Sequence, residues 1–207
     1  MTHIISKSNY SQTITTRSTI IKPITHNEIK QKYISWLNDD KVNKFLETRH
    51  LEQTEIKAVD YINSLRSVTN CDMFSIFDRD TNSHIGNLTI TSFNTNNNGS
   101  VDFGIMIGDM TSRSIGIGAE VMISFIEFIF SFDIIERISA SAASENFKSC
   151  HTLESIGFKR EGVIRKIFPL NDGGKCDVVR YGLLKEEWMD KRKRFLTFLN
   201  MTEILSN

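Results

Sequence analysis

The sequence predicts a mixed α/β fold in which helices cover both faces of a mostly antiparallel sheet. Segments in which apolar residues recur every second position alternate with segments in which they recur every third or fourth. Turn sequences rich in Asn, Asp and Gly join neighbouring strands, as expected for antiparallel hairpins. One helix is apolar on nearly every side, which requires that other elements cover it.

Each element follows from its spacing of apolar residues. The predicted strands are residues 13–25, 73–77, 84–90, 100–107, 134–142, 158–167 and 177–184. The predicted helices are residues 27–39, 52–65, 116–132, 144–156 and 185–199. Pro23 marks the end of the first strand, and Gly157 is a suitable residue to end the fourth helix. The turns are predicted at residues 78–82, 96–99 and 171–174.

The helix at residues 116–132 carries few polar side chains. They are spaced at i, i+4, i+7 and i+11, which places them in one strip along the helix. These residues are Glu120, Ser124, Glu127 and Ser131. We expect this strip to face solvent and the rest of the helix to be buried.

Charge and targeting signals narrow the function classes. The 25 basic and 25 acidic residues give a formal net charge of zero, which argues against a nucleic-acid binder and favours small molecules or peptides as partners. Residues 1–16 lack the apolar core of a secretory signal, and the apolar run at residues 121–132 is too short and too interrupted for a membrane span. We therefore expect a cytoplasmic protein with no membrane partner.

The cysteines do not indicate a disulfide framework or a metal site. Cys71, Cys150 and Cys176 are odd in number and widely spaced, and no CxxC pair occurs. Neither a disulfide framework nor a zinc site is predicted, so we expect reduced thiols and no metal.

A glycine-bearing loop at residues 113–118 lies between a predicted strand and the apolar helix. Such a loop presents unpaired amides and the positive end of the helix dipole, which bind phosphate groups. A Walker loop would continue with Lys-Ser or Lys-Thr, but Ala119 and Glu120 follow Gly118. A dinucleotide fingerprint would need a third glycine where Val121 stands. Both nucleotide-binding alternatives therefore fit poorly.

The same loop, Arg113-Ser114-Ile115-Gly116-Ile117-Gly118, resembles the Q/R-x-x-G-x-G/A pyrophosphate loop of the GNAT acyltransferase superfamily. Downstream, Asn146-Phe147-Lys148-Ser149 and residues 153–162 resemble the N-x-x-S and L-E-x-x-G-F-x-x-E-G segments of one branch. That branch includes ribosomal-protein N-terminal acetyltransferases and many acetyltransferases of amino sugars and small amines. Further similarity lies at residues 36–42 and 172–188, so the resemblance covers about residues 15 to 190.

The resemblance implies a sheet of about seven strands with a V-shaped splay that holds acetyl-CoA as cosubstrate. It implies one such domain over residues 13–203, after a flexible polar tail at residues 1–12. The pantetheine arm would bind along a strand like an added strand. The residues expected to contact the cofactor are Ile105, Met106 and Ile107 on the strand, Arg113, Ser114, Ile115, Gly116, Ile117, Gly118 and Ala119 in the loop, and Asn146, which contacts pantetheine or caps its helix.

Acetyl transfer to an amine needs a base, because an ammonium group cannot attack the thioester. The resemblance places Asp102 beside the splay as the first candidate base and Glu47 in the acceptor loop as the second. Many GNAT enzymes protonate the leaving thiolate with a tyrosine where this chain has Leu153, and the substitute in this branch is Ser149. Trp36 and Arg49 are expected to bind the acceptor.

Other nucleophiles and bases fit less well. Cys150 could form an acetyl-cysteine, but its neighbour His151 points about 100° away around the helix and cannot serve as its base. His84 is interpreted as a residue that flanks a turn. Arg49 and His50 could bind an acidic group of the acceptor, or they could be exposed loop residues without a role. Direct transfer in a ternary complex is therefore the expected mechanism.

Three functions remain open from the sequence. The first is acetylation of a primary amine on a small molecule such as an amino sugar, which could be nucleotide-linked. The second is acetylation of a protein N-terminus, against which the neutral net charge argues weakly. The third is an acyl-CoA-binding module without catalysis, for which Leu153 is the best argument. Exposed edge strands would also allow a homodimer.

Overall fold

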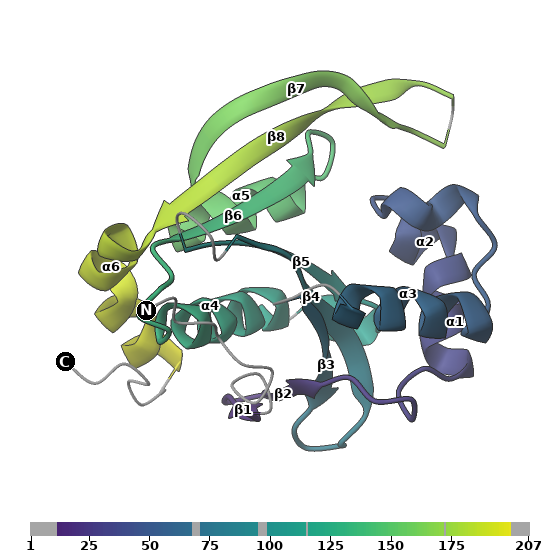
Figure 1. The fold of residues 1–207 in the computed structure, drawn as a ribbon, viewed down its shortest axis with the longest axis horizontal. Helices are drawn as coiled ribbons and strands as arrows, with labels where there is room; N and C mark the ends of the chain where they lie inside the picture. Colours follow the sequence, from purple (N-terminus) through teal and green to yellow (C-terminus); the bar gives the residue numbers. More distant parts are fainter. Residues whose placement is uncertain (1–11, 68–70, 95–98, 115, 172, 200–207) are drawn as a thin grey trace.

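An eight-stranded sheet organises the computed structural model, which describes residues 12–67, 71–94, 99–114, 116–171 and 173–199 (Figure 1). The strand order is β1-β2-β3-β4-β5-β6-β8-β7. Every neighbouring pair is antiparallel except β5 and β6, which run parallel. The predicted fold class, a mixed and mostly antiparallel sheet with helices on both faces, is confirmed.

The elements follow the predicted order. The strands are β1 (Ile14–Thr15), β2 (Thr19–Pro23), β3 (Asp72–Asp78), β4 (His84–Asn94), β5 (Ser100–Ile107), β6 (Arg137–Ala143), β7 (Lys159–Pro169) and β8 (Lys175–Leu184). The helices are α1 (Gln31–Asn38), α2 (Asp40–Asn43), α3 (Glu55–Ser67), α4 (Ile117–Phe130), α5 (Phe147–Ile156) and α6 (Lys185–Leu199), with 3-10 turns η2 (Glu47–His50) and η3 (Thr111–Ser114).

Two differences from the predicted elements have physical causes. The first predicted strand is two strands, because a turn closed by a hydrogen bond from the Thr16 amide to the Thr19 carbonyl, 2.8 Å long, reverses the chain. The short helices α2 and η2 were not predicted, because four residues are too few to show a helical period. The predicted turn at residues 96–99 lies mostly outside the described residues.

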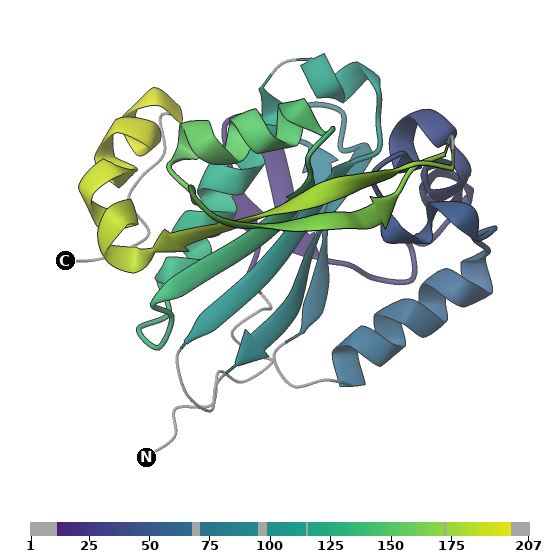
Figure 2. The same ribbon diagram turned by 90° about the horizontal axis from the view of Figure 1, so that it is seen from above.

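Apolar side chains form a core on each face of the sheet. The larger core lies between the sheet and α4, α5 and α6, and includes Phe74 of β3 packed edge-on against Phe125 of α4. The smaller core lies on the opposite face, where α1 and α3 pack on Met73. Figure 2 shows α3, in blue, and α5, in green, on opposite sides of the sheet. The pocket described below lies at the gap between β5 and β6 and is lined by residues of both α3 and α5.

The polar residues of α4 do not form the solvent-facing strip that we expected. Glu120, Ser124 and Glu127 are all buried. Glu120 accepts hydrogen bonds from the Thr16 hydroxyl and from the Ser18 amide, the latter 2.7 Å long. The strip therefore faces the β1–β2 turn at one end and α6 at the other, and partners on those elements replace water. Burial of this helix on almost every side is as predicted.

The strands β5 and β6 separate after three paired residues. Parallel pairing joins Ser100–Asp102 to Arg137–Ser139 and does not continue beyond Asp102 and Ser139. Beyond that point β5 pairs only with β4, and β6 pairs with β8 as far as Ala143. The predicted V-shaped splay is therefore present. None of the described helices is long and apolar enough to cross a membrane.

Candidate active site

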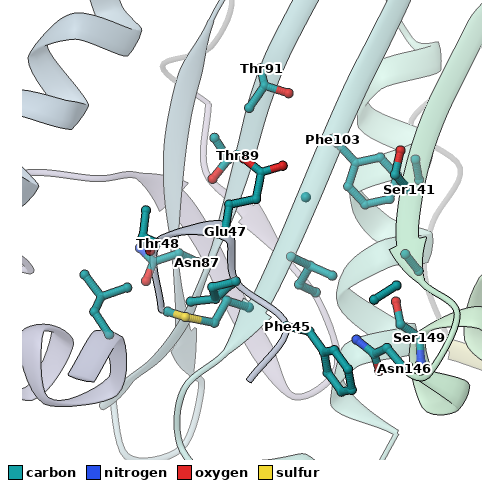
Figure 3. A pocket seen from close by; sticks show the side chains of 18 of the residues that line it. Phe45, Glu47, Thr48, Asn87, Thr89, Thr91, Phe103, Ser141, Asn146 and Ser149 are labelled. Carbon is teal, nitrogen blue, oxygen red and sulfur yellow. Dashed lines mark hydrogen bonds between the residues drawn. The ribbon is translucent and has the colours of Figure 1, made fainter. Parts of the chain in front are cut away.

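A pocket of about 470 Å³ occupies the splay and extends to the face of the sheet under α1 and α3 (Figure 3). Segments from both strands form its walls, and the start of α5 closes one end. The residues on these walls are Phe103, Gly104, Ile105 and Met106 of β5, Ala140, Ser141, Ala142 and Ala143 of β6, and Asn146, Ser149 and Leu153 at α5. Side chains from the β7–β8 hairpin, Phe168 and Val178, complete this part of the lining.

Gly104 leaves the backbone of β5 open to the pocket, because it has no side chain. A Cβ atom at this position would meet nothing within 4 Å, so the strand backbone borders open space. A glycine inside a strand commonly marks a place where a ligand backbone approaches closely. Gly104 was not predicted as a site residue, although a glycine between Phe103 and Ile105 in a run of strand-forming residues was the available signal.

The glycine loop opens toward solvent at the start of α4. Gly116 caps the helix with a φ of 74°, in the left-handed region that favours glycine, and no side chain caps the first amides. A Cβ atom at Gly116 or Gly118 would meet nothing within 4 Å. The amides of Ile117, Gly118 and Ala119 have no partner within the helix, so they can bind an anion. Ser114 ends η3, and Ile115 lies outside the described residues.

Arg113 holds the loop in place. Its Nε donates to the Ile107 carbonyl at 2.8 Å, and its Nη1 donates to the Lys41 carbonyl at 3.0 Å. Burial lowers the pKa of this guanidinium. Arg113 thus joins the loop to the end of β5 and to α2, and its contact with a phosphate stays a prediction. The Ile107 carbonyl accepts this hydrogen bond, and Ile107 does not line the pocket.

Lys148 lies beside the loop, and its position within the Asn146–Ser149 motif did not by itself indicate a role. Its Nζ donates to the Arg113 carbonyl at 2.6 Å. Lys148 is exposed, and it lies in the first turn of α5. The structure therefore places an ammonium group at the loop that precedes α4.

The start of α5 brings two predicted site residues together. The Oδ1 of Asn146 accepts a hydrogen bond from the Ser149 amide at 3.3 Å, so Asn146 caps the helix. Both residues line the pocket, as does Leu153. Cys150 does not line it, and its Sγ faces the Ala143 carbonyl at 3.7 Å.

The two predicted bases have different surroundings. Glu47 of η2 lines the pocket, and Figure 3 shows its carboxylate pointing into the space between β4 and β6. Burial raises the pKa of the neighbouring Tyr61 phenol, and the charge of Glu47 adds to this effect. Asp102 lies at the apex of the splay, outside the pocket lining, and its Oδ2 is 3.9 Å from Nη2 of Arg180. Burial raises the pKa of Asp102, and Arg180 opposes that shift.

The two residues expected to bind the acceptor are not on the pocket surface. Trp36 is 6% exposed and packs against Gly108, where a Cβ atom would fall 2.0 Å from the indole. Arg49 is 8% exposed, stacks 4.2 Å from the Phe168 ring centroid and donates to the Leu46 carbonyl at 2.8 Å. Neither side chain lines the pocket, although Nε and Nη2 of Arg49 have no hydrogen-bond partner among the described residues, and binding of the acceptor by these two residues stays a prediction. His50, at the end of η2, is exposed and does not line the pocket.

His84 flanks a turn, as expected, but it is also packed among aromatic rings. The Trp36 and Phe77 rings lie 5.0 Å and 5.4 Å from it, centroid to centroid. Burial lowers the pKa of His84 to about 4, so the imidazole is neutral at pH 7. This residue does not line the pocket.

The part of the pocket under α1 and α3 is built on β4. Asn87, Thr89 and Thr91 line it, whereas Leu88 and Ile90 between them are fully buried in the larger core. Polar residues at alternate strand positions indicate a sheet face that is not covered by the core. That alternation was visible in the sequence, and it was the signal by which these residues could have been found.

Among the described residues, no group of three or more His, Cys, Asp or Glu side chains is placed to hold a metal ion.

Known proteins share this fold and sequence pattern. An uncharacterized N-acetyltransferase of Bacillus subtilis, YnaD, is 23% identical over 175 residues, which cover 84% of this chain and 98% of that one. The structure is similar to that of Mycobacterium smegmatis RimJ in complex with CoA-disulfide, with a TM-score of 0.77, 16% identity and coverage of 94% and 98%. It is also similar to spermidine N-acetyltransferase from Vibrio cholerae in complex with CoA and spermine, with a TM-score of 0.74, 18% identity and coverage of 83% and 98%.

A family profile decides the assignment. The profile described as an acetyltransferase (GNAT) domain matches residues 19–159, which is more than half of the chain. The match includes the splayed strands, the glycine loop, the start of α5 and the β4 residues that line the pocket. The chain belongs to the GNAT acetyltransferase family.

Proposed function

We propose that this protein moves an acetyl group from acetyl-CoA to the primary amine of a small molecule, such as an amino sugar, by direct transfer in a ternary complex. One observation carries the proposal. The pocket in the splay reaches from Asn146 and Ser149 at the start of α5 to the carboxylate of Glu47 on the acceptor side. A thioester and an amine can therefore meet in one continuous space.

The residues present fit acetyl-CoA. The amides of Ile117, Gly118 and Ala119, with Lys148 beside the loop, suit the pyrophosphate. The edge of β5 that no longer pairs with β6 suits the amide groups of the pantetheine arm, with Ile105 and Met106 as the backbone partners. Gly104 leaves room for close approach. When bound, acetyl-CoA supplies a thioester, which is an activated acetyl donor.

Glu47 supplies the base in this proposal. The acceptor amine must lose a proton before its nitrogen forms a bond to the acetyl carbon, and a carboxylate in the pocket can take that proton directly or through water. Asp102 is the weaker candidate, because it lies outside the lining and beside Arg180. As the new carbon–nitrogen bond forms, the carbon–sulfur bond breaks, and the Ser149 hydroxyl can hydrogen-bond to the departing sulfur and relay a proton to it.

The acceptor wall favours a compact substrate. Helices α1 and α3 contribute Tyr33, Ala58 and Tyr61 to the lining, so the pocket continues beneath them against β4. A molecule that fits under two helices is small. The peptide chain that follows a protein N-terminus would have to pass these side chains to leave the pocket. Acetylation of a protein N-terminus is therefore the second hypothesis, and the experiment below tests it as well.

The experiment measures acetyl-CoA-dependent thiol release with two acceptor pools and a control without acceptor. One pool contains amino sugars, and the other contains peptides with free N-termini. Release with amino sugars supports the proposal, and release with peptides only assigns the chain to protein N-termini. Absence of release with either pool, together with thermal stabilisation by acetyl-CoA, would favour a binding module without catalysis.

A further inference from the structure

We infer that the acceptor is an amino alcohol with one ammonium group and no negative charge. An uncharged hydroxyl or amide group of this molecule binds the side chain of Asn87. This inference rests on the proposed function and names the substrate class for the same pocket. Two independent observations carry it, the charge of the lining and the state of the Asn87 carboxamide.

The lining holds one charged side chain among the described residues, the carboxylate of Glu47. A phosphate or carboxylate on the acceptor would need a cation in the pocket, because a buried charge without a partner is costly. The nearby Arg49 does not line the pocket. Its guanidinium stacks on Phe168 and donates from Nη1 to the Leu46 carbonyl, while Nε and Nη2 have no hydrogen-bond partner among the described residues. A polyamine would place a second ammonium group where no second carboxylate lines the wall. The lining therefore matches a single positive charge.

Asn87 supplies the second contact. It is 2% exposed and lines the pocket, yet neither Oδ1 nor Nδ2 has a hydrogen-bond partner in the described part of the structure. The carboxamide also interacts with the His84 side chain and opposes the lowering of the pKa of that ring, but this contact does not meet normal hydrogen-bond geometry at Oδ1 or Nδ2. Buried amides are almost always paired in folded proteins. An unsatisfied donor and acceptor that face a pocket indicate a polar group of the ligand.

Glu47 and Asn87 line the same pocket, so one acceptor can contact both. Figure 3 shows both side chains bordering the same space, together with Thr89 of β4. The ammonium group and the uncharged polar group can therefore belong to one small molecule. Hydroxyl groups serve well, because each can both donate to Oδ1 and accept from Nδ2. Apolar side chains such as Leu37 and Met73 line the remainder, which suits an uncharged body.

The chain provides a matched control. Ser75 of β3 lies directly opposite Asn87 in the sheet and is fully buried, and its hydroxyl also has no hydrogen-bond partner among the described residues. Unlike Asn87, it does not line the pocket. Removing the Ser75 hydroxyl therefore reproduces the loss of an unsatisfied polar group on this sheet without touching the acceptor.

The experiment compares the kcat/KM of the full chain for D-glucosamine, D-galactosamine and serinol with three further amines at saturating acetyl-CoA. Cyclohexylamine carries one ammonium group and no hydroxyl, spermidine carries several ammonium groups, and a uridine-diphosphate-linked glucosamine carries phosphates. We expect the best amino alcohol to exceed each of these three by roughly tenfold or more. In Asn87→Leu, we expect the KM for that amino alcohol to rise by roughly tenfold while the KM for acetyl-CoA stays within about twofold.

The controls separate binding from folding. Ser75→Ala should leave both KM values unchanged, and Asn87→Leu should not lower the melting temperature, because it removes an unsatisfied amide. The wild-type preferences test the inference even if Asn87→Leu does not fold. Turnover that favours spermidine, the nucleotide-linked sugar or cyclohexylamine would overturn the inference alone, as would an unchanged KM in Asn87→Leu. Absence of thiol release with all six amines would overturn the proposed function, and the inference with it.

Discussion

The ammonium group of Lys148 donates a hydrogen bond of 2.6 Å to the backbone carbonyl of Arg113. This contact joins the first turn of α5 to the loop that precedes α4, and it keeps a positive charge beside the unpaired amides of that helix. Both features favour binding of a pyrophosphate, because the loop is positioned and the local potential is positive before the ligand arrives.

Replacing Lys148 should therefore weaken acetyl-CoA binding. We expect Lys148→Met to raise the Kd by roughly 5- to 30-fold, corresponding to about 1–2 kcal/mol, and we expect the difference from wild type to shrink at high salt. Titration calorimetry at two salt concentrations measures both effects. Lys193→Met, an exposed lysine of α6, is the control. An equal Kd for Lys148→Met and Lys193→Met would show that the ammonium group has no part in binding.

Gly118 tests the loop without straining its backbone. Its φ is not in the left-handed region and a Cβ atom there meets nothing within 4 Å, so Gly118→Ala and Gly118→Asp should both fold. An aspartate in the first turn also interacts favourably with the helix dipole. We expect Gly118→Ala to raise the Kd for acetyl-CoA a few-fold, and Gly118→Asp to raise it by roughly 100-fold through repulsion of the pyrophosphate.

Calorimetry with each Gly118 variant, together with its melting temperature, checks this expectation. A melting temperature for Gly118→Asp at or above that of wild type would show that the loop still folds. Wild-type affinity in a folded Gly118→Asp would mean that the pyrophosphate binds elsewhere.

The loop and the order of elements could be predicted because they depend on local sequence. Gly116 and Gly118 follow a strand and lie at the start of an apolar helix, and that local pattern was sufficient to predict a glycine loop at the start of α4; its binding of phosphate stays a prediction. The position of a long side chain is different. Arg113 reaches carbonyls of Ile107 and Lys41, and the contact with Lys41 spans 72 positions in the sequence, which no local spacing reveals.

The buried pair of Glu127 and Arg192 should dominate the attachment of α6. Glu127 of α4 is fully buried and accepts a hydrogen bond of 2.8 Å from Nε1 of Trp188 as well as the ion pair from Arg192. Glu127→Ala removes the carboxylate that both side chains share. We expect it to lower the free energy of unfolding by about 3–5 kcal/mol, the usual cost of removing one partner of a buried pair.

Urea denaturation of Glu127→Ala measures this loss. Glu186→Ala, which removes an exposed carboxylate from the first turn of α6, provides the control and should change the unfolding free energy by less than about 1 kcal/mol. Similar losses for the two variants would show that the buried pair does not stabilise the attachment.

His84 should make stability depend on pH. Its pKa in the folded chain is about 4, below the ordinary value of 6.5, because burial among aromatic rings disfavours the charged form, while the nearby Glu28 and Lys32 act in opposite directions. Between these two values the unfolded chain binds more protons than the folded chain, so stability falls as the pH falls from 6.5 toward 4. The loss from this residue is about 3 kcal/mol at most.

Urea midpoints of wild type and His84→Gln at pH 7 and pH 5 isolate this contribution, because the carboxylates titrate in both proteins. We expect the wild type to lose more stability than His84→Gln on going to pH 5. An equal loss in the two proteins would mean that the folded chain admits the protonated ring.

The residues that line the proposed acceptor side of the pocket could be predicted only in part from the sequence. Glu47 could be placed near the acceptor from its neighbourhood in the chain, but Trp36, 11 positions earlier, was assigned to the same surface and lies in the core. An aromatic residue on an amphipathic helix has the same pattern in either role, and only tertiary packing against Gly108 decides between them. Asp102 is a similar case, because the ion pair with Arg180 joins strands that are far apart in the sequence.

Acetyl transfer to an amino sugar in wild type, Glu47→Gln and Asp102→Asn at saturating acetyl-CoA tests most directly whether Glu47 is the general base. We expect Glu47→Gln to lower kcat by roughly 100-fold or more, within the range for loss of a general base, and Asp102→Asn to change kcat by less than about threefold. The Kd for acetyl-CoA should be the same in all three proteins. A kcat for Glu47→Gln close to that of wild type, with a large loss in Asp102→Asn, would contradict this role of Glu47.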